Sequence, residues 1–344
     1  MTLDRSATMQ DLARLAGVSV ATVSRALSGK PGVSSATRSA IARLAREHSY
    51  TENLPARALS SGRTGRIAVT LPNVQAEYFA RILAGAAQVI HDGGFSLVLE
   101  TTQHEPGRQS DAIQRFMRMG VDGALLLLPA ESDREISALY DSGFKFVIID
   151  PIDQVTAPLP WITSTYAMGA RRAIEHLVDL GHRRIALITG EPYLFSTKER
   201  LHGVRQALEQ AGIPLEPGLV RESRYTDSAG AYEATLDLMR LPEPPTAIFA
   251  FNDRLAFGTL RAAHALDIAV PGSLSVVGFD DLEAAELVSP GLTTVRQPLS
   301  TMGSTAATML SQLINEQDPP AMHMQLATEL VVRQSTGAPP STPR

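Results

Sequence analysis

Residues 9–50 decide the fold of the first part of this chain, and their sequence is MQDLARLAGVSVATVSRALSGKPGVSSATRSAIARLAREHSY. The first apolar residues have the spacing of one helix face, i, i+3, i+4, i+7: Met9, Leu12, Ala13 and Ala16. This spacing predicts a helix that begins near Thr8 and ends at Gly17, where a left-handed cap has no Cβ penalty. Ser19 can then cap a second helix.

Two further helices follow from the same pattern. The second is predicted to bury Val23, Ala26 and Leu27 and to end at residues 29–32, which contain two glycines and a proline. The third begins at Ser34 or Ser35. Its predicted inward residues are Ile41, Leu44, Ala45 and His48, and its predicted outward residues are Arg38, Arg43 and Arg46. Three short helices, the first two joined by a tight turn with a glycine, describe a helix-turn-helix.

A helix-turn-helix inserts the start of its second helix into the major groove of DNA. Val20, Ala21 and Arg25 would then face base edges. The polar residues that would hydrogen-bond phosphates, which positions a protein without reading sequence, are Ser19, Thr22 and Ser24. Small three-helix units also serve as protein-binding modules, so the helical pattern alone leaves both partners open.

Charge is divided unevenly along the chain, and this division favours nucleic acid. Residues 1–66 contain ten basic and four acidic side chains, a net charge of +6, whereas the whole chain carries −5, so residues 67–344 carry −11. A basic head on an acidic body is typical of a nucleic-acid-binding domain joined to another domain. Chance clustering of charges on a solvated surface is the alternative.

The head resembles the headpiece of the LacI/GalR (lactose-repressor/galactose-repressor) family of transcriptional regulators. The family pattern A-G-V-S-x-x-T-V-S-R is present at residues 16–25, and V-S, T-R and a tyrosine follow at 33–34, 37–38 and Tyr50. The resemblance implies that the chain binds operator DNA. The headpiece residues that it implies in DNA binding are Ser19, Val20, Ala21, Thr22, Ser24, Arg25, Ser28 and Tyr50.

A short connector follows the head. Residues 53–62, NLPARALSSG, predict a helix from about Leu54 to Ser60, which is too short to be stable alone because isolated helices under ~12 residues are marginal in water. The resemblance implies the hinge helix of the family, which pairs across a dimer in the minor groove, with DNA contacts from Asn53, Ala56 and the wedge residue Leu59. A flexible linker is the alternative, and Pro55 inside the segment departs from the family pattern.

The body of the chain alternates apolar strands with amphipathic helices. The predicted strands are 67–71, 96–99, 124–128, 146–149, 185–188, 220–223, 247–250 and 275–277. The predicted helices are 77–92, 107–119, 132–141, 167–180, 197–211, 228–240 and 253–266. This order predicts an α/β fold of doubly wound parallel sheets, whose ligands bind beyond the carboxyl ends of the strands. The half-and-half pattern predicts two similar lobes that face one cleft.

The body resembles the effector domain of the same family, which is similar to periplasmic sugar-binding proteins. The matching segments are EHLVDLGHRRI at 175–185, PTAIFAFND at 245–253, SVVGFDD at 275–281 and PGLTTVRQP at 290–298. With residues 1–62, the resemblance covers nearly the whole chain. It implies a three-helix helix-turn-helix headpiece plus hinge helix, then two doubly wound parallel-sheet lobes of periplasmic-binding-protein type.

The resemblance also implies an effector site between the lobes. Arg200 aligns with an arginine that clamps effector hydroxyls or carboxylates. The effector-binding residues that the resemblance implies are Asn73, Tyr78, Phe79, Asp150, Ser196, Arg200, Tyr225, Asn252 and Asp280. An aromatic flank with convergent Asp, Asn and Arg suits a sugar. For any single Asp or Asn at a strand end, an ordinary turn role is the alternative.

Two departures from the family bear on the effector. Ser164-Thr165 stands where many members have Asp-Asn, and Leu194 stands where the purine-repressor branch has an arginine. The second departure favours a carbohydrate over a purine. Trp161, the only tryptophan, is expected near the edge of the cleft, either as a stacking platform or as ordinary core packing.

Composition excludes several other classes of protein. The chain is 44% hydrophobic and 19% charged, which is a globular composition, and no apolar run reaches the ~18 residues of a membrane span. It has no cysteine, its N-terminus has no secretory signal, and its eight histidines show no pair at metal-ligand spacing. The P-loop, G-x-S-x-G and H-E-x-x-H motifs are missing. We therefore expect no metal, no cofactor, no enzymatic activity and no membrane partner, and a cytoplasmic location.

The expected domains are a helix-turn-helix domain at 1–52, a hinge helix and linker at 53–64, and an effector-binding and dimerisation domain at 65–344. Lobe one is expected at about 65–161 and 293–322, and lobe two at about 162–292 and 323–338. The Pro-rich segment 335–344 lacks the leucine heptads by which the lactose repressor forms tetramers, so a homodimer on a pseudo-palindromic operator is expected.

The expected function is a DNA-binding repressor of a carbohydrate-utilisation operon, released by a sugar between the lobes. A stand-alone cytoplasmic sugar-binding protein, or a regulator that uses its small-molecule ligand as a co-repressor, are the alternatives.

Overall fold

The chain folds into two units in the computed structural model, Met1–Thr64 and Gly65–Arg344. The structure describes residues 7–341 apart from 28, 30, 51–61, 104, 106, 130–132, 154, 156 and 157. Within these residues, none of the helices has the length and hydropathy required to cross a membrane.

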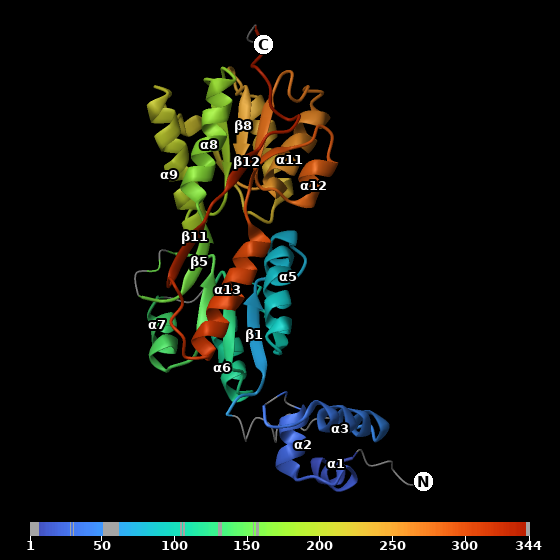
Figure 1. The fold of residues 1–344 in the computed structure, drawn as a ribbon. Coiled ribbons are helices and arrows are strands. Elements are labelled where there is room, and N and C mark those ends of the chain that lie inside the picture. Colours follow the sequence, from blue (N-terminus) through green and yellow to red (C-terminus); the bar gives the residue numbers. More distant parts are fainter. Residues whose placement is uncertain are drawn as a thin grey trace. The chain divides into compact units, whose positions relative to one another are not determined.

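The described residues of the first unit form three helices, α1 (Met9–Ala16), α2 (Val20–Leu27) and α3 (Ser35–Glu47) (Figure 1). Thr8 caps α1 by accepting the Asp11 amide (3.2 Å), while the Asp11 carboxylate accepts the Thr8 amide (3.0 Å), and Gly17 ends α1 with φ 64°. Ser19 accepts the Thr22 amide at the start of α2 (3.1 Å), and Ser34 caps α3. The predicted three-helix head is confirmed.

The core of this unit is built from one or two residues of each helix. Leu12, Val23 and Ile41 are fully buried. Two predicted core residues differ, because Leu27 is 37% exposed and His48 is exposed where α3 ends. Arg38, predicted to point outward, is instead half-buried, because its guanidinium donates to the Ala26 carbonyl (3.0 Å) and holds α3 against the end of α2.

The second unit contains two lobes, each built on a six-stranded sheet. The strands of lobe one are β1 (Arg66–Leu71), β2 (Ser96–Thr101), β3 (Gly123–Leu127), β4 (Phe146–Ile149), β5 (Trp161–Ser164) and β11 (His323–Leu326). They lie in the order β11-β5-β4-β3-β1-β2, and all are parallel. The helices of lobe one are α5 (Glu77–Asp92), α6 (Arg108–Arg118), α7 (Asp133–Asp141) and α13 (Leu299–Ile314).

Lobe two repeats this arrangement. Its strands are β6 (Ile185–Thr189), β7 (Val220–Glu222), β8 (Ala247–Ala250), β9 (Ser275–Asp280), β10 (Thr293–Arg296) and β12 (Glu329–Val331), in the order β12-β10-β9-β8-β6-β7. Only the pairing of β10 with β12 is antiparallel among the described strands. Its helices are α8 (Tyr166–Asp179), α9 (Phe195–Gln210), α10 (Ser228–Met239), α11 (Asp253–Ala265) and α12 (Glu283–Leu287), with a 3-10 turn, η1 (Pro217–Leu219).

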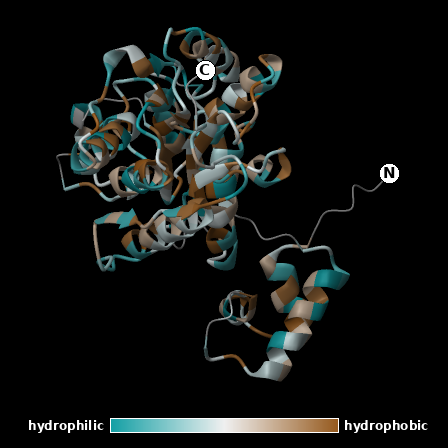
Figure 2. Ribbon diagram, turned by 90° about the horizontal axis from the view of Figure 1, so that it is seen from above, coloured by the Kyte–Doolittle hydropathy of each residue, from teal (hydrophilic) through white to brown (hydrophobic). Residues whose placement is uncertain are grey.

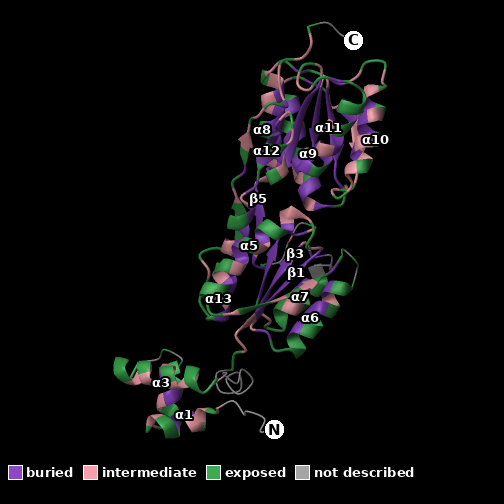
Figure 3. Cartoon of the chain, turned by 90° about the vertical axis from the view of Figure 1, so that its right-hand side faces the viewer, coloured by how far each residue is buried: buried purple, intermediate pink, exposed green. Residues whose placement is uncertain are grey.

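The central strands of both sheets are buried on both faces. Every residue of β3, β4, β6, β8 and β9 is buried, which is typical of parallel strands covered on both faces and accounts for their largely apolar sequences (Figure 3). Helices cover both faces, so each lobe has two apolar clusters, and hydrophobic residues gather toward the middle of the body (Figure 2). The predicted α/β fold of two doubly wound lobes is confirmed.

The chain crosses between the lobes three times, after β5, after β10 and between β11 and β12. β5 and β11 therefore belong to lobe one and β10 to lobe two, a few residues to either side of the expected limits at 161, 293 and 323. The strands β5, β10, β11 and β12 and the helix α13 were not among the predicted elements. At the crossovers, the hydroxyls of Thr165 and Thr328 lie 3.0 Å apart, and the Thr328 amide donates to Thr165 (3.0 Å).

The helices α5 and α13 of lobe one pack with their backbones in contact. A Cβ atom on Gly85 would lie 1.9 Å from the carbonyl oxygen of Ser300, and a Cβ on Gly303 would lie 1.9 Å from the carbonyl oxygen of Ile82. Both positions therefore require glycine, and α13, into which the second crossover leads, packs closely on α5.

Candidate functional sites in the helix-turn-helix and between the lobes

The start of α2 presents an exposed face. Val20 is 42% exposed, and the side chain of Arg25 lies on the same helix. The predicted contact residues of this segment that are exposed are Ser19, Val20, Ala21, Ser24 and Arg25, and Thr22 is half-buried beside Ser19. Small side chains next to one arginine are what a helix needs to approach base edges closely in a groove.

The remaining predicted DNA contacts have different places. Tyr50 packs against the core of the first unit, and its amide donates to the Ala45 carbonyl (2.8 Å). Ser28, Asn53, Ala56 and Leu59 lie outside the described residues, as does the predicted hinge helix. The hinge therefore stays a prediction.

In the second unit, Asp150 of lobe one accepts hydrogen bonds from residues of both lobes. It follows β4 of lobe one in the left-handed region (φ 57°) and is 5% exposed. The hydroxyl of Tyr78 on α5 donates to Asp150 Oδ2 (2.7 Å). Asp150 Oδ1 accepts a short hydrogen bond from the hydroxyl of Tyr166, the first residue of α8 in lobe two, and a longer one from Thr163 (3.5 Å). Burial raises the pKa of Asp150, and these hydroxyls oppose that shift.

Arg200 on α9 is buried in lobe two among aromatic rings. Its guanidinium donates to the Tyr225 hydroxyl (2.8 Å) and to the Phe251 carbonyl (2.7 Å). The guanidinium carbon lies 4.0 Å from the centre of the Phe279 ring and 4.8 Å from that of Tyr166. Aromatic faces attract a cation, so the rings hold the guanidinium in place without using its N–H groups.

Asp280 ends β9 close to Arg200. Its Oδ1 accepts the side-chain amide of Gln297 (2.7 Å) and lies 3.8 Å from Arg200 Nη2. Burial raises the pKa of Asp280 to about 7, against the opposing effects of Arg200 and Gln297. The nearby Asp253 is fully buried, and burial raises its pKa well above the usual range.

Arg200 and Gln297 each have one polar atom that could form a further hydrogen bond. Arg200 Nε and Gln297 Oε1 are buried and have no hydrogen-bond partner within the described part of the chain. An unpaired buried donor or acceptor costs about 1–3 kcal/mol, so such atoms need an explanation. A polar ligand that accepts from Arg200 and donates to Gln297 is one.

The other predicted effector residues have local structural roles. Asn73 accepts the Ala76 amide (2.9 Å) before α5, and Asn252 caps α11 by accepting the Leu255 amide (2.8 Å) while donating to the Tyr225 carbonyl (3.0 Å). Ser196 hydrogen-bonds Tyr225. Phe79 packs in the core of lobe one.

Sequence reasoning missed Tyr166 and Gln297, which contact the two carboxylates. Gln297 stands inside the PGLTTVRQP segment and directly follows β10, and this strand-end position could have identified it. Trp161 stacks on His323 with ring centres 5.1 Å apart and packs against the core of lobe one, in agreement with the packing interpretation of this residue. Among the described residues, no group of His, Asp or Glu side chains could hold a metal ion.

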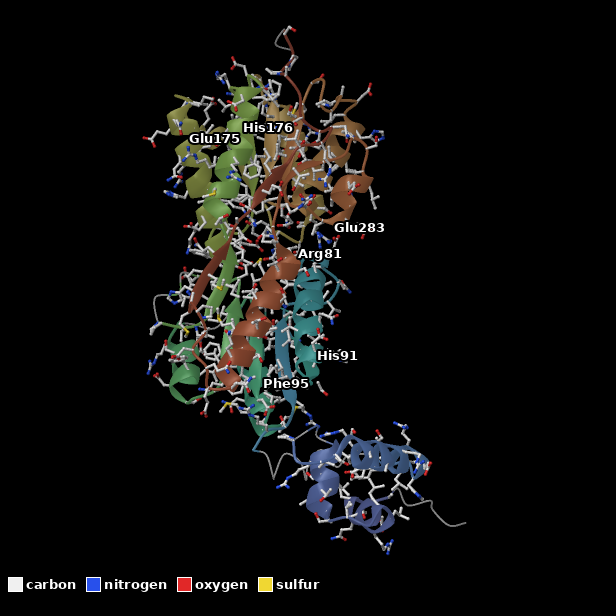
Figure 4. All side chains as sticks on the ribbon, viewed as in Figure 1. Arg81, His91, Phe95, Glu175, His176 and Glu283 are labelled. Carbon is white, nitrogen blue, oxygen red and sulfur yellow. The ribbon has the colours of Figure 1, made fainter. Side chains whose placement is uncertain are left out.

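The rim of the cleft carries further contacts between the lobes. Arg81 on α5 donates to the Asp281 carbonyl (2.7 Å), and the Glu283 amide at the start of α12 donates to the carboxylate of Glu77 (2.8 Å) (Figure 4). Elsewhere on the rim, the Phe195 amide donates to the Ile152 carbonyl (2.6 Å). The residues described above therefore lie at a closed interlobe junction.

Comparison with known proteins gives matches along the whole chain. Residues 8–53 match the family model of bacterial regulatory proteins, lacI family, and residues 174–336 match that of the periplasmic binding protein-like domain. The HTH-type transcriptional regulator DegA of Bacillus subtilis (strain 168) is 33% identical over 96% of this chain and 98% of its own length. The ribose operon repressor of Escherichia coli (strain K12) is 31% identical over 96% and 99%.

Two solved structures resemble the whole chain. The complex of the transcriptional regulator CelR with cellobiose has a TM-score of 0.73 at 31% identity, covering 96% of this chain and 99% of that one. The lac repressor dimer bound to operator and the anti-inducer ONPF has a TM-score of 0.85 at 28% identity, covering 97% and 100%. These relatives are transcriptional regulators and not enzymes, which confirms the expectation that the chain is not an enzyme.

Proposed function

This chain belongs to the lacI family of bacterial regulatory proteins and is a DNA-binding transcriptional regulator, and we propose that it represses a carbohydrate-utilisation operon until a sugar binds between its lobes. The observation that supports a sugar as the ligand is the set of residues at the interlobe junction. Two buried carboxylates, Asp150 and Asp280, lie there together with aromatic rings and the buried Arg200, whose Nε has no hydrogen-bond partner among the described residues. Sugars offer hydroxyls that both donate and accept, and apolar C–H faces that pack on aromatic rings.

The names of the relatives support the same class of ligand. One relative is a ribose operon repressor, and one structural neighbour is a complex with cellobiose. In this proposal the effector site consists of Asn73, Tyr78, Phe79, Asp150, Ser196, Arg200, Tyr225, Asn252 and Asp280. To this set we add Gln297, because its Oε1 is buried without a partner among the described residues.

The operator is bound by two copies of the chain. The lac repressor in the solved complex is a dimer on its operator, and a two-fold dimer requires a pseudo-palindromic site. The DNA contacts are Ser19, Val20, Ala21, Thr22, Ser24, Arg25, Ser28 and Tyr50 from the headpiece, and Asn53, Ala56 and Leu59 from the hinge. A regulator of this kind acts on the chromosome, so its place is the bacterial cytoplasm.

In this proposal, sugar binding and operator binding are coupled by thermodynamic linkage. A sugar that binds one arrangement of the lobes more tightly shifts the protein toward that arrangement, and the shift equals the difference in affinity. In the proposal, the sugar-bound arrangement disfavours the paired hinge helices and so releases the operator.

Gel shift with DNA from upstream of the chain's own gene and the adjacent genes tests the proposal. The protein should bind one fragment, and D-ribose or cellobiose, or another member of a mono- and disaccharide panel, should release it. A sugar that strengthens the complex would instead identify a co-repressor, and a panel without effect would contradict the sugar-responsive function.

Base reading is tested by Arg25→Ala, which should weaken operator binding by about 1–3 kcal/mol more than binding to unrelated DNA. Arg43→Ala is the matched control, since Arg43 lies on α3 and pairs with Glu47 (3.7 Å). Equal losses on both DNAs would make Arg25 a phosphate contact only.

Leu59→Ala should reduce operator bending in a circular-permutation assay while sugar binding stays intact.

A further inference from the structure

Tyr166 occupies a place in the cleft that none of the family-derived contacts occupies. It is the first residue of α8, directly after the first crossover, and it is 2% exposed. Its hydroxyl donates to Asp150 Oδ1 in lobe one. The face of its ring lies 4.8 Å from the guanidinium carbon of Arg200 in lobe two, and its ring centre lies 6.2 Å from that of Phe279. Tyr166 therefore touches the carboxylate with one end and the cation with its face.

This position matters because Asp150 and Arg200 are ionisable groups of opposite charge and are both buried. Such charges attract strongly, and a direct ion pair would occupy N–H groups of Arg200 and an oxygen of Asp150 that could otherwise bind a ligand. Arg200 is near enough to lower the pKa of Asp150. Yet, of the carboxylates in the described part of the chain, the one in ion-pair contact with Arg200 is Asp280, at 3.8 Å. Tyr166 contacts both groups, Asp150 through its hydroxyl and Arg200 through the face of its ring.

We propose that Tyr166 is a positioning residue that sets the ligand specificity of the cleft by holding Asp150 and Arg200 apart. Asp150 then stays an acceptor with a defined orientation, and Arg200 keeps its Nε available as a donor. A site with separate acceptors and donors, and with two carboxylates against one arginine, selects an uncharged, hydroxyl-rich ligand and repels one that carries its own carboxylate. The inference rests on the proposed function, because it concerns the same cleft.

The position of Tyr166 is tested first without any ligand, by thermal unfolding of the full chain at pH 5 and pH 8. Tyr166→Phe keeps the ring and removes the hydroxyl, so the ionised form of Asp150 loses a donor. The substitution should therefore be more harmful at pH 8, where this carboxylate is more ionised, than at pH 5. We expect the loss in Tm relative to the unchanged chain to be larger by about 2–4 °C at pH 8.

Two references separate this effect from a loss of packing. In an Asp150→Asn background, Tyr166→Phe should lower Tm equally at both pH values. Tyr225→Phe removes a buried hydroxyl of the same cleft that contacts Arg200 and not Asp150, so its loss should not grow with pH in the same way. The charged groups that also face Asp150 are Arg200 and Asp280, and all of these variants keep them. A pH-independent loss for Tyr166→Phe in the unchanged background would overturn the proposal.

Specificity is tested by calorimetric titration with D-ribose and cellobiose and with their aldonic acids, D-ribonate and cellobionate. Whichever of the two neutral sugars binds should have an affinity at least tenfold higher than that of its own aldonic acid. Tyr166→Phe should weaken that sugar at least tenfold, while the surface variant Tyr140→Phe leaves it unchanged. Unchanged sugar affinity in Tyr166→Phe would overturn the specificity role. If neither sugar binds, the same titrations are made with the sugar of the mono- and disaccharide panel that releases the operator, and with its aldonic acid. If no sugar of the panel binds the unchanged chain, the sugar-responsive function fails, and the pH comparison still decides the position of Tyr166.

Discussion

Lobe one and lobe two arrange their six strands in the same order, so β4 and β9 occupy equivalent places in the two sheets. Each strand leads to a buried aspartate with positive φ, Asp150 (57°) in lobe one and Asp280 (125°) in lobe two. Asp150 is surrounded by hydroxyl donors, whereas Asp280 accepts the Gln297 amide and faces Arg200. Equivalent positions of the two sheets thus carry different carboxylate environments. Asp150 is held by neutral hydroxyl donors, whereas Asp280 lies opposite a cation.

The difference teaches that a nearby cation does not by itself keep a buried carboxylate ionised. Arg200 lowers the pKa of Asp280, yet the balance of burial and of further acids, Asp150 and Glu77, leaves this pKa at about 7. The two aspartates should therefore respond differently when their partners are removed.

The largest difference is expected for Arg200→Ala. It leaves Asp280 without its cation and the Phe251 carbonyl without its donor, so we expect a loss of about 3–5 kcal/mol in the free energy of unfolding at pH 8. Urea denaturation followed by circular dichroism measures this loss. At pH 5, where Asp280 is protonated, the loss should be smaller. A loss below about 1 kcal/mol at pH 8 would show that Arg200 does not stabilise this lobe.

The second difference is the pH dependence that Asp280 gives to stability. Its folded pKa of about 7 lies above its ordinary value of 3.8, so the folded chain binds more protons than the unfolded chain between these values. Stability from this group is therefore present at low pH and is lost as pH rises toward 7, by at most about 1.4 kcal/mol per pH unit. Asp280→Asn should remove this part of the slope.

Denaturation series from pH 4 to 8 check that slope. Asp267→Asn is a matched control, because Asp267 is exposed and also has a positive φ (55°). Burial and the neighbouring Asp280 also raise the pKa of Asp253, so Asp253 contributes a slope of the same sign, which Asp267→Asn retains and Asp280→Asn reduces. An unchanged slope in Asp280→Asn would contradict the titration of Asp280 in this range.

In lobe one the corresponding change is Tyr78→Phe. It removes the 2.7 Å hydrogen bond to Asp150, and a hydrogen bond to a charged group contributes about 1.5–3 kcal/mol. Urea denaturation at pH 8 should show this loss. Tyr193→Phe, at a residue that is 60% exposed, serves as the control and should change stability little. If Tyr78→Phe were as harmful as Arg200→Ala, the two lobes would not differ as described.

The smallest effect compares an asparagine of each lobe near the start of a helix. Asn73 accepts the Ala76 amide in the turn before α5, and Asn252 caps α11; aspartate can accept the same amide in either place. Only the side-chain amide of Asn252 also donates, to the Tyr225 carbonyl (3.0 Å). Asn252→Asp should therefore cost about 1 kcal/mol, whereas Asn73→Asp should stay within about 0.5 kcal/mol. Thermal unfolding of both variants tests this, and equal losses would assign Asn252 a capping role alone.

Much of the fold could be predicted from the sequence because its signals are local. The helix α5 has the predicted bounds, and the caps at Thr8 and Ser34 identify two helix starts in the head. The missed strands β10, β11 and β12 have three or four residues each and lie near the crossovers. β4 and β8 are as short but are purely apolar, whereas the missed strands contain polar residues, so no apolar run identifies them, and their pairing depends on residues far away in the sequence.

The cleft could be predicted only in part, for a related reason. Asp150 and Asp280 directly follow apolar strands, so their position at the ligand edge of a sheet is visible in the sequence. Tyr166 has no such signal, because an aromatic residue at a helix start is equally compatible with core packing. Its role depends on the first crossover, which brings the start of α8 next to β4 of the other lobe.

The close packing of α5 on α13 at Gly85 and Gly303 has a mechanical consequence for lobe one. α13 starts two residues after Gln297 and has 16 residues, so it is about 24 Å long. Because no side chain separates α13 from α5 at the two glycines, nothing compressible lies there to absorb a small displacement. A rotation of α13 by about 5° at its Gln297 end would displace its other end by about 2 Å, and α5 would move with it. The α5–α13 pair should therefore move as one rigid body, and the centre of its rotation lies beside Gln297, the residue that donates a hydrogen bond to Asp280.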